Sequence, residues 1–471
     1  MEKFNTSKLW LLFETLSEKE LRQLRNFLRS PFYTRREDVF RLYEHLRRHR
    51  KKGVVALTAE GAFAYTFPDE AYDSLKLRGT MSDLLELIEQ YMLSKHFEKG
   101  KLPADFALVS IYRSRGLDKH FRWAMNKLKQ KVSRFPYQNA DFHSHKLAYQ
   151  MELMYHQTRN RRTGRLNLQA VSGQMDCQYL AQKLRHACTQ LSHQAVYQTE
   201  YDFGLLSPIV AQVEAMGFLD VPAIAIYYYC YRFLTEAYSL EYFQAFREQL
   251  AGHAALFPEE ERKDLYLLAI NFCIRQLNRG SAPFAREAWE MYRIGLREGF
   301  LLDNGQLSRF AFNNIVGIAL KLGETAWAAD FIEQYHSSIG DDFREATLSL
   351  NQARLAYARA DFGRALLLLQ NVEYEDLVTN LIARMLLLRI YYLQGELDAL
   401  SSQLSSLENF VRRASFSQFH KENYLNIARF VKRLISLPPY DKEEREKLRQ
   451  DIEAADPLSE KEWLLAQLPT G

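Results

Sequence analysis

The chain has 471 residues, of which 47% are apolar and 25% charged, a composition that supports a large buried core and excludes an intrinsically disordered protein. It contains only 20 glycines and 12 prolines, fewer than the turns of a strand-rich fold need, so we expect an all-α protein. The net charge of +4 is uneven. Residues 1–165 contain 32 Lys and Arg against 19 Asp and Glu, a balance of +13, and the remaining residues carry −9.

No segment of the sequence is typical of export or membrane insertion. The apolar run Leu9–Phe13 is interrupted by Glu14 and is too short for a signal peptide. The longest apolar run, Ala223–Tyr231, is less than half of the ~20 residues that span a bilayer. The closest two of the four cysteines are eleven residues apart, which excludes a CxxC motif. We therefore expect a soluble, cytoplasmic protein without disulfide bonds.

The first helices are predicted from their start signals. Ser17 with Glu20, and Thr34 with Glu37, match the capping box, in which a hydroxyl and a carboxylate satisfy unpaired amides at a helix start. Helices are therefore expected to begin near Ser17 and Thr34. Apolar residues three and four positions apart predict further helices at about 69–97, 104–115, 118–133, 139–160 and 167–192. Residues 1–165 are thus predicted to form a basic, irregular α-helical amino-terminal region.

Two dense basic stretches lie at the ends of predicted helices in this region. They contain Arg47, Arg48, Arg50, Lys51 and Lys52 in the first stretch, and Arg161, Arg162 and Arg165 in the second. Such stretches can bind nucleic acid or another polyanion. They can also be solvated cations that complement the negative end of a helix dipole. Nucleic-acid binding through this region is the alternative function that we consider.

From about residue 205 the sequence reads as helix, short turn and helix, repeated. Three stretches align on their turns, Ile318–Ile332, Leu355–Leu369 and Ile390–Leu404, with offsets of 37 and 35 residues. The aligned turn pairs are Gly323-Glu324, Ala360-Asp361 and Gly395-Glu396. A small residue allows a tight turn after the first helix, and an acid favours the start of the second. Ala328, Ala365 and Leu400 follow at the positions where the second helix would cross the first.

These stretches resemble tetratricopeptide repeats, helical hairpins of about 34 residues. The resemblance covers residues 307–410 best and 205–300 weakly, and the Trp-x-x-Leu-Gly-x-x-Tyr pattern of the family is mostly missing. It implies a right-handed helical-hairpin solenoid, which we place at residues 166–435. The segment LSEKELRQLRNFLRSPFY also looks like the start of a group of uncharacterised bacterial proteins, a resemblance that implies no function.

The last region, residues 436–471, is predicted to be a charged helical cap. A highly charged helix is expected at Asp441–Ala454, and the capping-box pattern of Ser459 and Glu462 predicts a last short helix. Solenoids need such polar terminal units to shield their final core face.

Asn314 and Asn351 occupy equivalent positions of adjacent first helices. The tetratricopeptide resemblance implies that such asparagines hold the backbone of an extended peptide on the concave face. Ordinary hydrogen bonding between helices is the alternative. Tyr227 and Tyr231 belong to an aromatic run that could line the same groove, although tyrosines in such a run also serve as packing residues.

The sequence contains no GxGxxG, GxxxxGK[ST], GxSxG or HExxH motif. Its histidines and cysteines lack the spacing of a shared metal site, so we expect no catalytic residue, metal or cofactor. The leading hypothesis is a non-enzymatic scaffold whose solenoid groove binds a protein or peptide partner. A nucleic-acid-binding protein is the second hypothesis. A helical enzyme is the third, and a cluster of perturbed titrating groups in one pocket would favour it.

Overall fold

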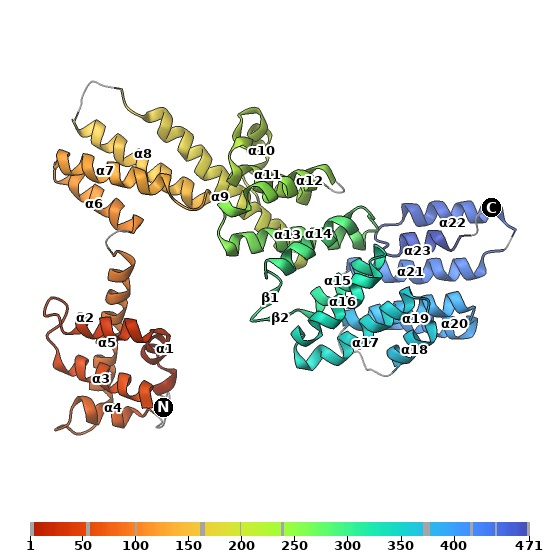
Figure 1. Ribbon diagram of the computed structural model, residues 1–471, viewed down its shortest axis with the longest axis horizontal. Coiled ribbons are helices and arrows are strands. Elements are labelled where there is room, and N and C mark those ends of the chain that lie inside the picture. Colours follow the sequence, from red (N-terminus) through yellow and green to blue (C-terminus); the bar gives the residue numbers. More distant parts are fainter. Residues whose placement is uncertain are drawn as a thin grey trace. The chain divides into compact units, whose positions relative to one another are not determined.

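The computed structural model describes residues 4–52, 57–98, 101–160, 165–197, 199–236, 240–370, 377–414, 418–438 and 440–468. Helices dominate these ranges, and strands contribute only four residues to them (Figure 1). The predicted all-α fold class is therefore confirmed. None of the helices in the described ranges combines the length and the apolar character that crossing a membrane requires.

The chain forms two compact units. The first comprises residues 1–135 and 145–171, and the second comprises residues 136–144 and 172–471. The chain passes between them at three points, of which one lies between residues 135 and 136 and the other two lie inside the helices α8 (Ala140–Asn160) and α9 (Leu168–Tyr197). The predicted separation of a cap at residue 436 lies within the second unit and stays a prediction.

The first unit is built from short helices around an apolar core. Its remaining elements are η1 (Phe4–Thr6), α1 (Lys8–Thr15), α2 (Glu18–Leu28), α3 (Glu37–Lys52), α4 (Ala59–Thr66), α5 (Ser74–His96), α6 (Leu102–Ser114) and α7 (Asp118–Ser133). Helices α1 to α5 share one buried cluster that includes Phe13, Leu24, Tyr43 and Ile88. The Tyr43 hydroxyl donates to the carbonyl of Leu21 at 2.6 Å, so the largest buried side chain of α3 also satisfies its polar atom.

One of the two predicted start signals in this unit is confirmed and the other is wrong. At α2, the Glu20 amide donates to Ser17 Oγ at 3.3 Å and the Ser17 amide donates to Glu20 Oε2 at 2.7 Å, which forms the capping box. Helix α3 does begin close to Thr34, at Glu37, but without the predicted capping box. The Thr34 hydroxyl accepts from the amide of Arg36, two residues on, and so makes a local turn instead of a helix cap.

The second unit contains a long succession of helices. Its elements after α9 are α10 (Leu206–Ala215), η2 (Phe218–Asp220), α11 (Pro222–Thr235), α12 (Leu240–His253), η3 (Ala254–Leu256), α13 (Glu259–Asn278), α14 (Phe284–Arg297), β1 (Leu302–Asp303), β2 (Gln306–Leu307), α15 (Arg309–Lys321), α16 (Thr325–Tyr335), η4 (His336–Ser338), α17 (Asp341–Ala358), α18 (Phe362–Gln370), α19 (Leu377–Gln394), α20 (Leu397–Arg413), α21 (Gln418–Ser436), α22 (Lys442–Ala454) and α23 (Lys461–Ala466).

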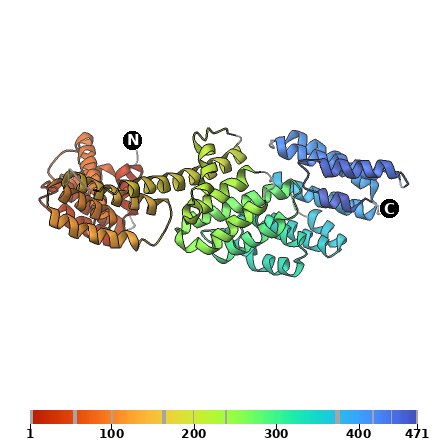
Figure 2. The same cartoon turned by 90° about the horizontal axis from the view of Figure 1, so that it is seen from above.

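Consecutive helices of this unit pack in pairs. Helix α11 packs on α12, α13 on α14, α15 on α16, α17 on α18 and α19 on α20. The first helices of neighbouring pairs also touch, because α17 contacts both α15 and α19. In the view from above, the green and cyan helices of this unit lie beside their neighbours in the chain (Figure 2). Helices α15, α17 and α19 therefore form adjoining parts of one face.

The three aligned turns are confirmed. Gly323, Ala360 and Gly395 adopt left-handed φ values of 80°, 60° and 72°. The amide that follows each of them donates to the carbonyl five residues back, on Ala319, Ala356 and Tyr391, at 2.9 to 3.0 Å. This pattern is the Schellman termination of a helix, which requires a left-handed residue at that position. The predicted crossing residues Ala328, Ala365 and Leu400 are all fully buried.

The sequence analysis missed a small hairpin. Strands β1 and β2 pair antiparallel, with Leu302 opposite Leu307 and Asp303 opposite Gln306. The two loop residues, Asn304 and Gly305, have φ values of 50° and 81°. An Asn-Gly pair between apolar residues favours this type of turn, so the signal was present in the sequence.

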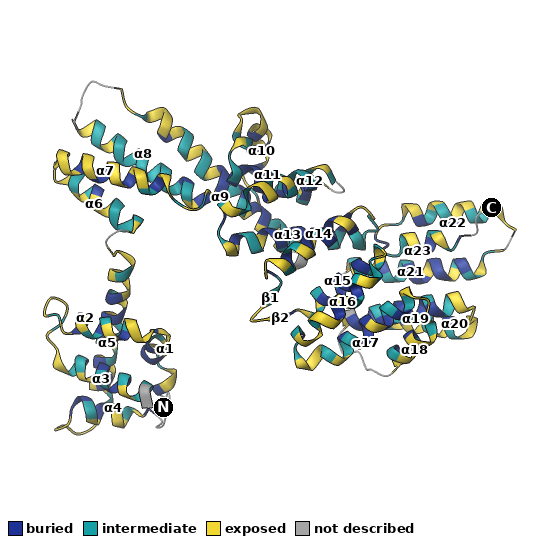
Figure 3. Cartoon of the chain, viewed as in Figure 1, coloured by how far each residue is buried: buried dark blue, intermediate teal, exposed yellow. Residues whose placement is uncertain are grey.

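Buried side chains of the second unit form three apolar clusters, and Figure 3 shows them as dark blue stretches on the packed sides of the helices. The largest includes Ala140 of α8 and continues from α9 to Ile339, directly after η4. A smaller one lies among α17, α18 and α19, and the last joins α19 to α23. Leu458, Leu464 and Leu468 of the carboxyl-terminal segment belong to the last cluster. Burial of these leucines fixes the segment on the helices that precede it in the chain.

Candidate functional site

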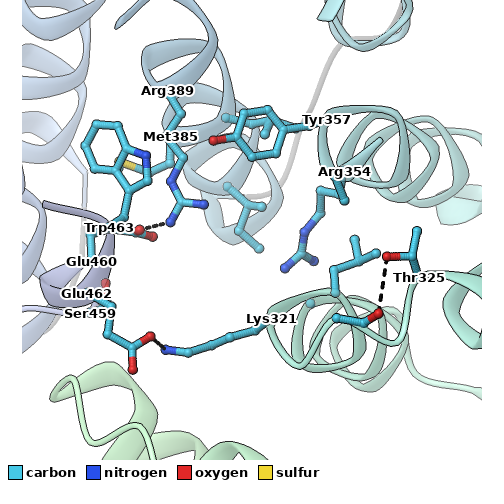
Figure 4. A pocket seen from close by; sticks show the side chains of 16 residues that line it. Lys321, Thr325, Arg354, Tyr357, Met385, Arg389, Ser459, Glu460, Glu462 and Trp463 are labelled. Carbon is cyan, nitrogen blue, oxygen red and sulfur yellow. Dashed lines mark hydrogen bonds and ion pairs between the residues drawn. The ribbon is translucent and has the colours of Figure 1, made fainter. Parts of the chain in front are cut away.

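A pocket of about 540 Å³ opens on the face that α15, α17 and α19 form. Its fourth side is the segment from Ser459 to Trp463, which leads into α23 (Figure 4). Leu320, Tyr357, Met385 and Leu386 give it apolar walls, and five charged side chains surround the opening. These are Lys321, Arg354, Arg389, Glu460 and Glu462. The pocket therefore combines an apolar surface with a concentration of charge.

The Ser459 segment is positioned by α21. The Ser459 amide donates to Asn423 Oδ1 at 2.7 Å, and Asn423 Nδ2 donates to Ser459 Oγ at 3.1 Å. The predicted capping box at Ser459 and Glu462 is therefore wrong, because Ser459 is engaged with another helix. Helix α23 starts at Lys461, without a side-chain cap. This tertiary contact leaves Glu462 available for the pocket.

Two ion pairs join the segment to the face. Arg389 of α19 pairs with Glu460, and Lys321 of α15 pairs with Glu462 at 2.9 Å. The ring of Trp463 lies 5.5 Å from the Arg389 guanidinium, within the range of a cation–π contact. The segment thus covers two of the three cations that line the pocket.

Arg354, on the helix between these two, has a different environment. Its Nη1 donates to the carbonyl of Asn313 at 2.7 Å and lies 3.4 Å from Oδ1 of Asn351. Both acceptors are neutral, and within the described ranges no carboxylate forms an ion pair with Arg354. Figure 4 shows its guanidinium pointing into the open centre of the pocket.

Burial, together with the smaller effect of the positive charge of Arg389, lowers the pKa of Arg354 to about 10. At neutral pH the group is still a cation, so it acts as a fixed charge and cannot exchange protons as an acid or base catalyst. The chemistry that this arrangement supports is the binding of an anion.

These pocket residues were missed by the sequence analysis, although the repeat alignment contained a signal. Gly317, Arg354 and Arg389 immediately precede the three aligned stretches and are therefore equivalent positions of three first helices. Two arginines one repeat apart, on a face that adjoins the previous helix, indicate a shared basic site. Only the cations were recognisable in this way, because the acids come from a segment outside the repeats.

The predicted peptide-binding asparagines lie on this face of the unit but do not point into one common site. Asn351 is buried, and its Nδ2 donates to Asn313 Oδ1 at 2.6 Å and to the Thr347 carbonyl at 2.7 Å. This is the hydrogen bonding between helices that the sequence left as the alternative. Asn314 is half-buried and donates to the Tyr292 hydroxyl at 3.2 Å. Neither residue lines the pocket.

The predicted tyrosines lie on α11. Tyr227 is buried, and its hydroxyl donates at 2.9 Å to Glu261, a carboxylate that is itself 3% exposed. Asn139 Nδ2 donates to the other oxygen of Glu261 at 2.9 Å. Tyr231 is half-buried against the largest cluster. The hydroxyl of Tyr227 is thus used inside the fold.

The first basic stretch is placed on α3. Arg50 Nη1 donates to the carbonyls of Phe13 and Leu16 at the end of α1, Arg48 is exposed over the ring of Tyr65, and Arg47 is half-buried. The structure does not describe the side chains of Lys51 and Lys52. Arg161 and Arg162 lie outside the described residues, and Arg165 is exposed. Nucleic-acid binding stays a prediction, and a steep loss of DNA or RNA affinity with salt would support it.

No protein-family model, curated protein or solved structure matches this chain. Among the described residues, no three His, Cys, Asp or Glu side chains gather closely enough to hold a metal ion. The candidate site is therefore defined by its geometry and charge alone.

Proposed function

We propose that residues 166–435 form a right-handed, tetratricopeptide-like solenoid and that the protein is a non-enzymatic scaffold, which binds a segment of a protein partner in the pocket on α15, α17 and α19. The observation that carries the proposal is the pocket itself. It lies on three consecutive first helices, the surface on which a helical-hairpin array exposes a groove.

Two further observations support the proposal. The same Schellman turn recurs at offsets of 37 and 35 residues, and α17 packs on both α15 and α19, as stacked hairpins require. The pocket cations with a perturbed pKa, Arg354 and Arg389, are both arginines, and the two pocket acids are held in ion pairs. These charged side chains are better suited to binding a ligand than to transferring protons, because proton transfer needs a group that titrates near the working pH.

The proposal is tested by placing a photoreactive benzoylphenylalanine in the full chain at Tyr357, inside the pocket, and irradiating intact cells. A matched chain carries the same group at Tyr440, which is 95% exposed and distant from the pocket lining in sequence. We expect discrete crosslinked partners from position 357 that are absent from position 440.

The crosslinked segment of any such partner is then synthesised and titrated into the purified protein. Micromolar or tighter binding, abolished by a bulky substitution at Met385, would support the scaffold. Identical crosslinks from both positions, or crosslinked segments that do not bind the purified chain, would overturn it.

A further inference from the structure

The charges of the pocket do not balance. Three cations, Lys321, Arg354 and Arg389, face two carboxylates, Glu460 and Glu462, and each carboxylate is paired with a different cation. The remaining cation is Arg354, which belongs to the middle helix of the three. The pocket therefore carries one positive charge that no described carboxylate of the chain neutralises.

This uncompensated charge is partly removed from water, because Arg354 is half-buried. A partly buried guanidinium loses part of its hydration energy, and a carboxylate would compensate this loss more fully than the neutral oxygens of Asn313 and Asn351 do. Its Nη2 lies against Gly317, where only a residue without a side chain leaves room for it. The Arg354 guanidinium thus occupies the space that Gly317 leaves and points into the cavity.

The chain's own carboxyl-terminal segment indicates which ligand chemistry this face accepts. Within five residues it provides two glutamates and a tryptophan, and all three side chains engage the face. Glu460 reaches α19 and Glu462 reaches α15, so the cations on both sides of α17 are occupied. The face thus accommodates an acidic segment with an aromatic neighbour, and Arg354 is the cation left for a second such segment.

A carboxylate suits the position better than a phosphate. The pocket has a net charge of +1, which one carboxylate neutralises, whereas a phosphate monoester carries about −1.5 to −2 near pH 7 and would face the charges of Glu460 and Glu462. The apolar walls of Tyr357, Met385 and Leu386 add contact area for residues beside the acid.

We propose that Arg354 binds the side-chain carboxylate of an acidic residue, flanked by apolar residues, in a segment of a protein partner. This inference rests on the proposed scaffold function and names the ligand class of the same pocket. The interaction is a charge-assisted hydrogen bond at a partly desolvated guanidinium, whose loss weakens binding about tenfold or more.

The test uses fluorescent pentapeptides with an acetylated amino end and an amidated carboxyl end, so that no terminal charge contributes. Each has leucine and tryptophan around a central residue, which is Glu, Gln, Lys or phosphoserine. Affinity for the purified full chain is measured by anisotropy at about 50 and 300 mM salt. We expect the Glu peptide to bind at least about tenfold more tightly than the other three, with weaker binding at the higher salt.

Variants locate the site. Arg354→Gln and Arg354→Lys are expected to lose the preference for the Glu peptide, the lysine because it cannot reproduce the planar set of guanidinium donors. Arg359→Gln, at an exposed arginine that follows α17, is the matched control and should bind as the unchanged protein does. Gly317→Ala keeps the charge of Arg354 but displaces its guanidinium, so this variant should also bind the Glu peptide more weakly. It provides a second test of the site if the Arg354 variants fold poorly.

Equal affinity for the Glu and Gln peptides, no binding of any peptide below about 1 mM, or unchanged binding by folded Arg354→Gln would each overturn the inference. Tighter binding of the phosphoserine peptide would replace it with recognition of a phosphorylated partner. The scaffold function fails separately, through the crosslinking from Tyr357, which does not depend on the charge of the ligand.

Discussion

Gly317 of α15 and Arg354 of α17 share one space, since a Cβ atom at position 317 would lie 2.0 Å from Nη2 of Arg354. The two residues occupy equivalent positions of adjacent repeats. Gly317 has no side chain and so leaves space, and the charged guanidinium of Arg354 fills that space. Position 317 thus needs a glycine because of Arg354 on the next helix. No turn requires it, since Gly317 lies inside α15 with ordinary helical geometry.

Gly317→Ala is predicted to move Arg354 while changing stability little. The clashing atom is the end of a flexible side chain, and alanine favours helix over glycine by about 0.5–1 kcal/mol, so the two effects on the free energy of unfolding oppose each other. Urea denaturation measures the sum. Gly363→Ala is the control, because that glycine is exposed in α18 with no atom near the new methyl group, and it should be neutral or stabilising. A loss above about 3 kcal/mol in Gly317→Ala alone would show that Arg354 cannot yield.

Asn351→Ala is predicted to lower the free energy of unfolding by about 1–3 kcal/mol, because it removes two hydrogen bonds of a buried amide and leaves Asn313 Oδ1 without its donor. Asn314→Ala removes one bond from a half-buried residue, and the expected loss is about 0.5–1 kcal/mol. Chemical denaturation of the two variants side by side checks the order. A larger loss from Asn314→Ala would contradict the different burial of the two amides.

Tyr227→Phe is predicted to destabilise the second unit by about 1.5–3 kcal/mol, since the buried carboxylate of Glu261 loses one of its donors. Tyr231→Phe is a matched control on the same helix, where no hydrogen bond of the hydroxyl is found within the described residues, and it should stay within about 0.5 kcal/mol. Thermal unfolding of both variants makes the comparison. Equal melting temperatures would mean that the bond to Glu261 contributes nothing net.

His45 is predicted to make α3 less stable in acid. Burial lowers its pKa to about 4, with smaller contributions from the charges of His49 and Arg48, and its Nε2 has no hydrogen-bond partner. Because the unfolded chain binds this proton near pH 6.5 and the folded chain does not, stability decreases as the pH falls from about 6.5 to 4, by roughly 2–3 kcal/mol in total.

Hydrogen exchange of the α3 amides at pH 7 and at pH 4.5 measures this loss locally. His45→Gln, which cannot take up a proton, should reduce the difference in protection between the two pH values. If the acid sensitivity of α3 is the same in both proteins, another group is responsible.

The sequence was sufficient for those features that local chemistry determines. The three turns at Gly323, Ala360 and Gly395 were predicted because a small residue followed by an acid encodes a helix end directly. The capping patterns at Thr34 and Ser459 failed because the same hydroxyl can bond elsewhere, to a local amide in one case and to Asn423 in the other.

Most of the candidate site could not be predicted from local sequence patterns. The cations of the pocket come from three repeats, but Glu460 and Glu462 reach them from a segment far along the chain, and no periodicity links the two sets. The asparagines that the repeat alignment selected lie one turn away from the arginines and serve the packing of the helices instead. The alignment thus selected residues on the helices that carry the pocket, but not the residues that line it, and a peptide-binding role for Asn314 and Asn351 stays a prediction.

The carboxyl-terminal segment also has a consequence for the protein during its synthesis. Arg354 and Arg389 leave the ribosome before Glu460 and Glu462 are made, and at ~5–20 residues per second the delay is on the order of seconds. In that interval Lys321, Arg354 and Arg389 are present on this face, but Glu460 and Glu462 are not yet there to form ion pairs with them. A partner that is present during translation therefore meets a more basic surface than one that meets the finished protein, so the timing of the encounter can decide which acidic segment occupies the pocket.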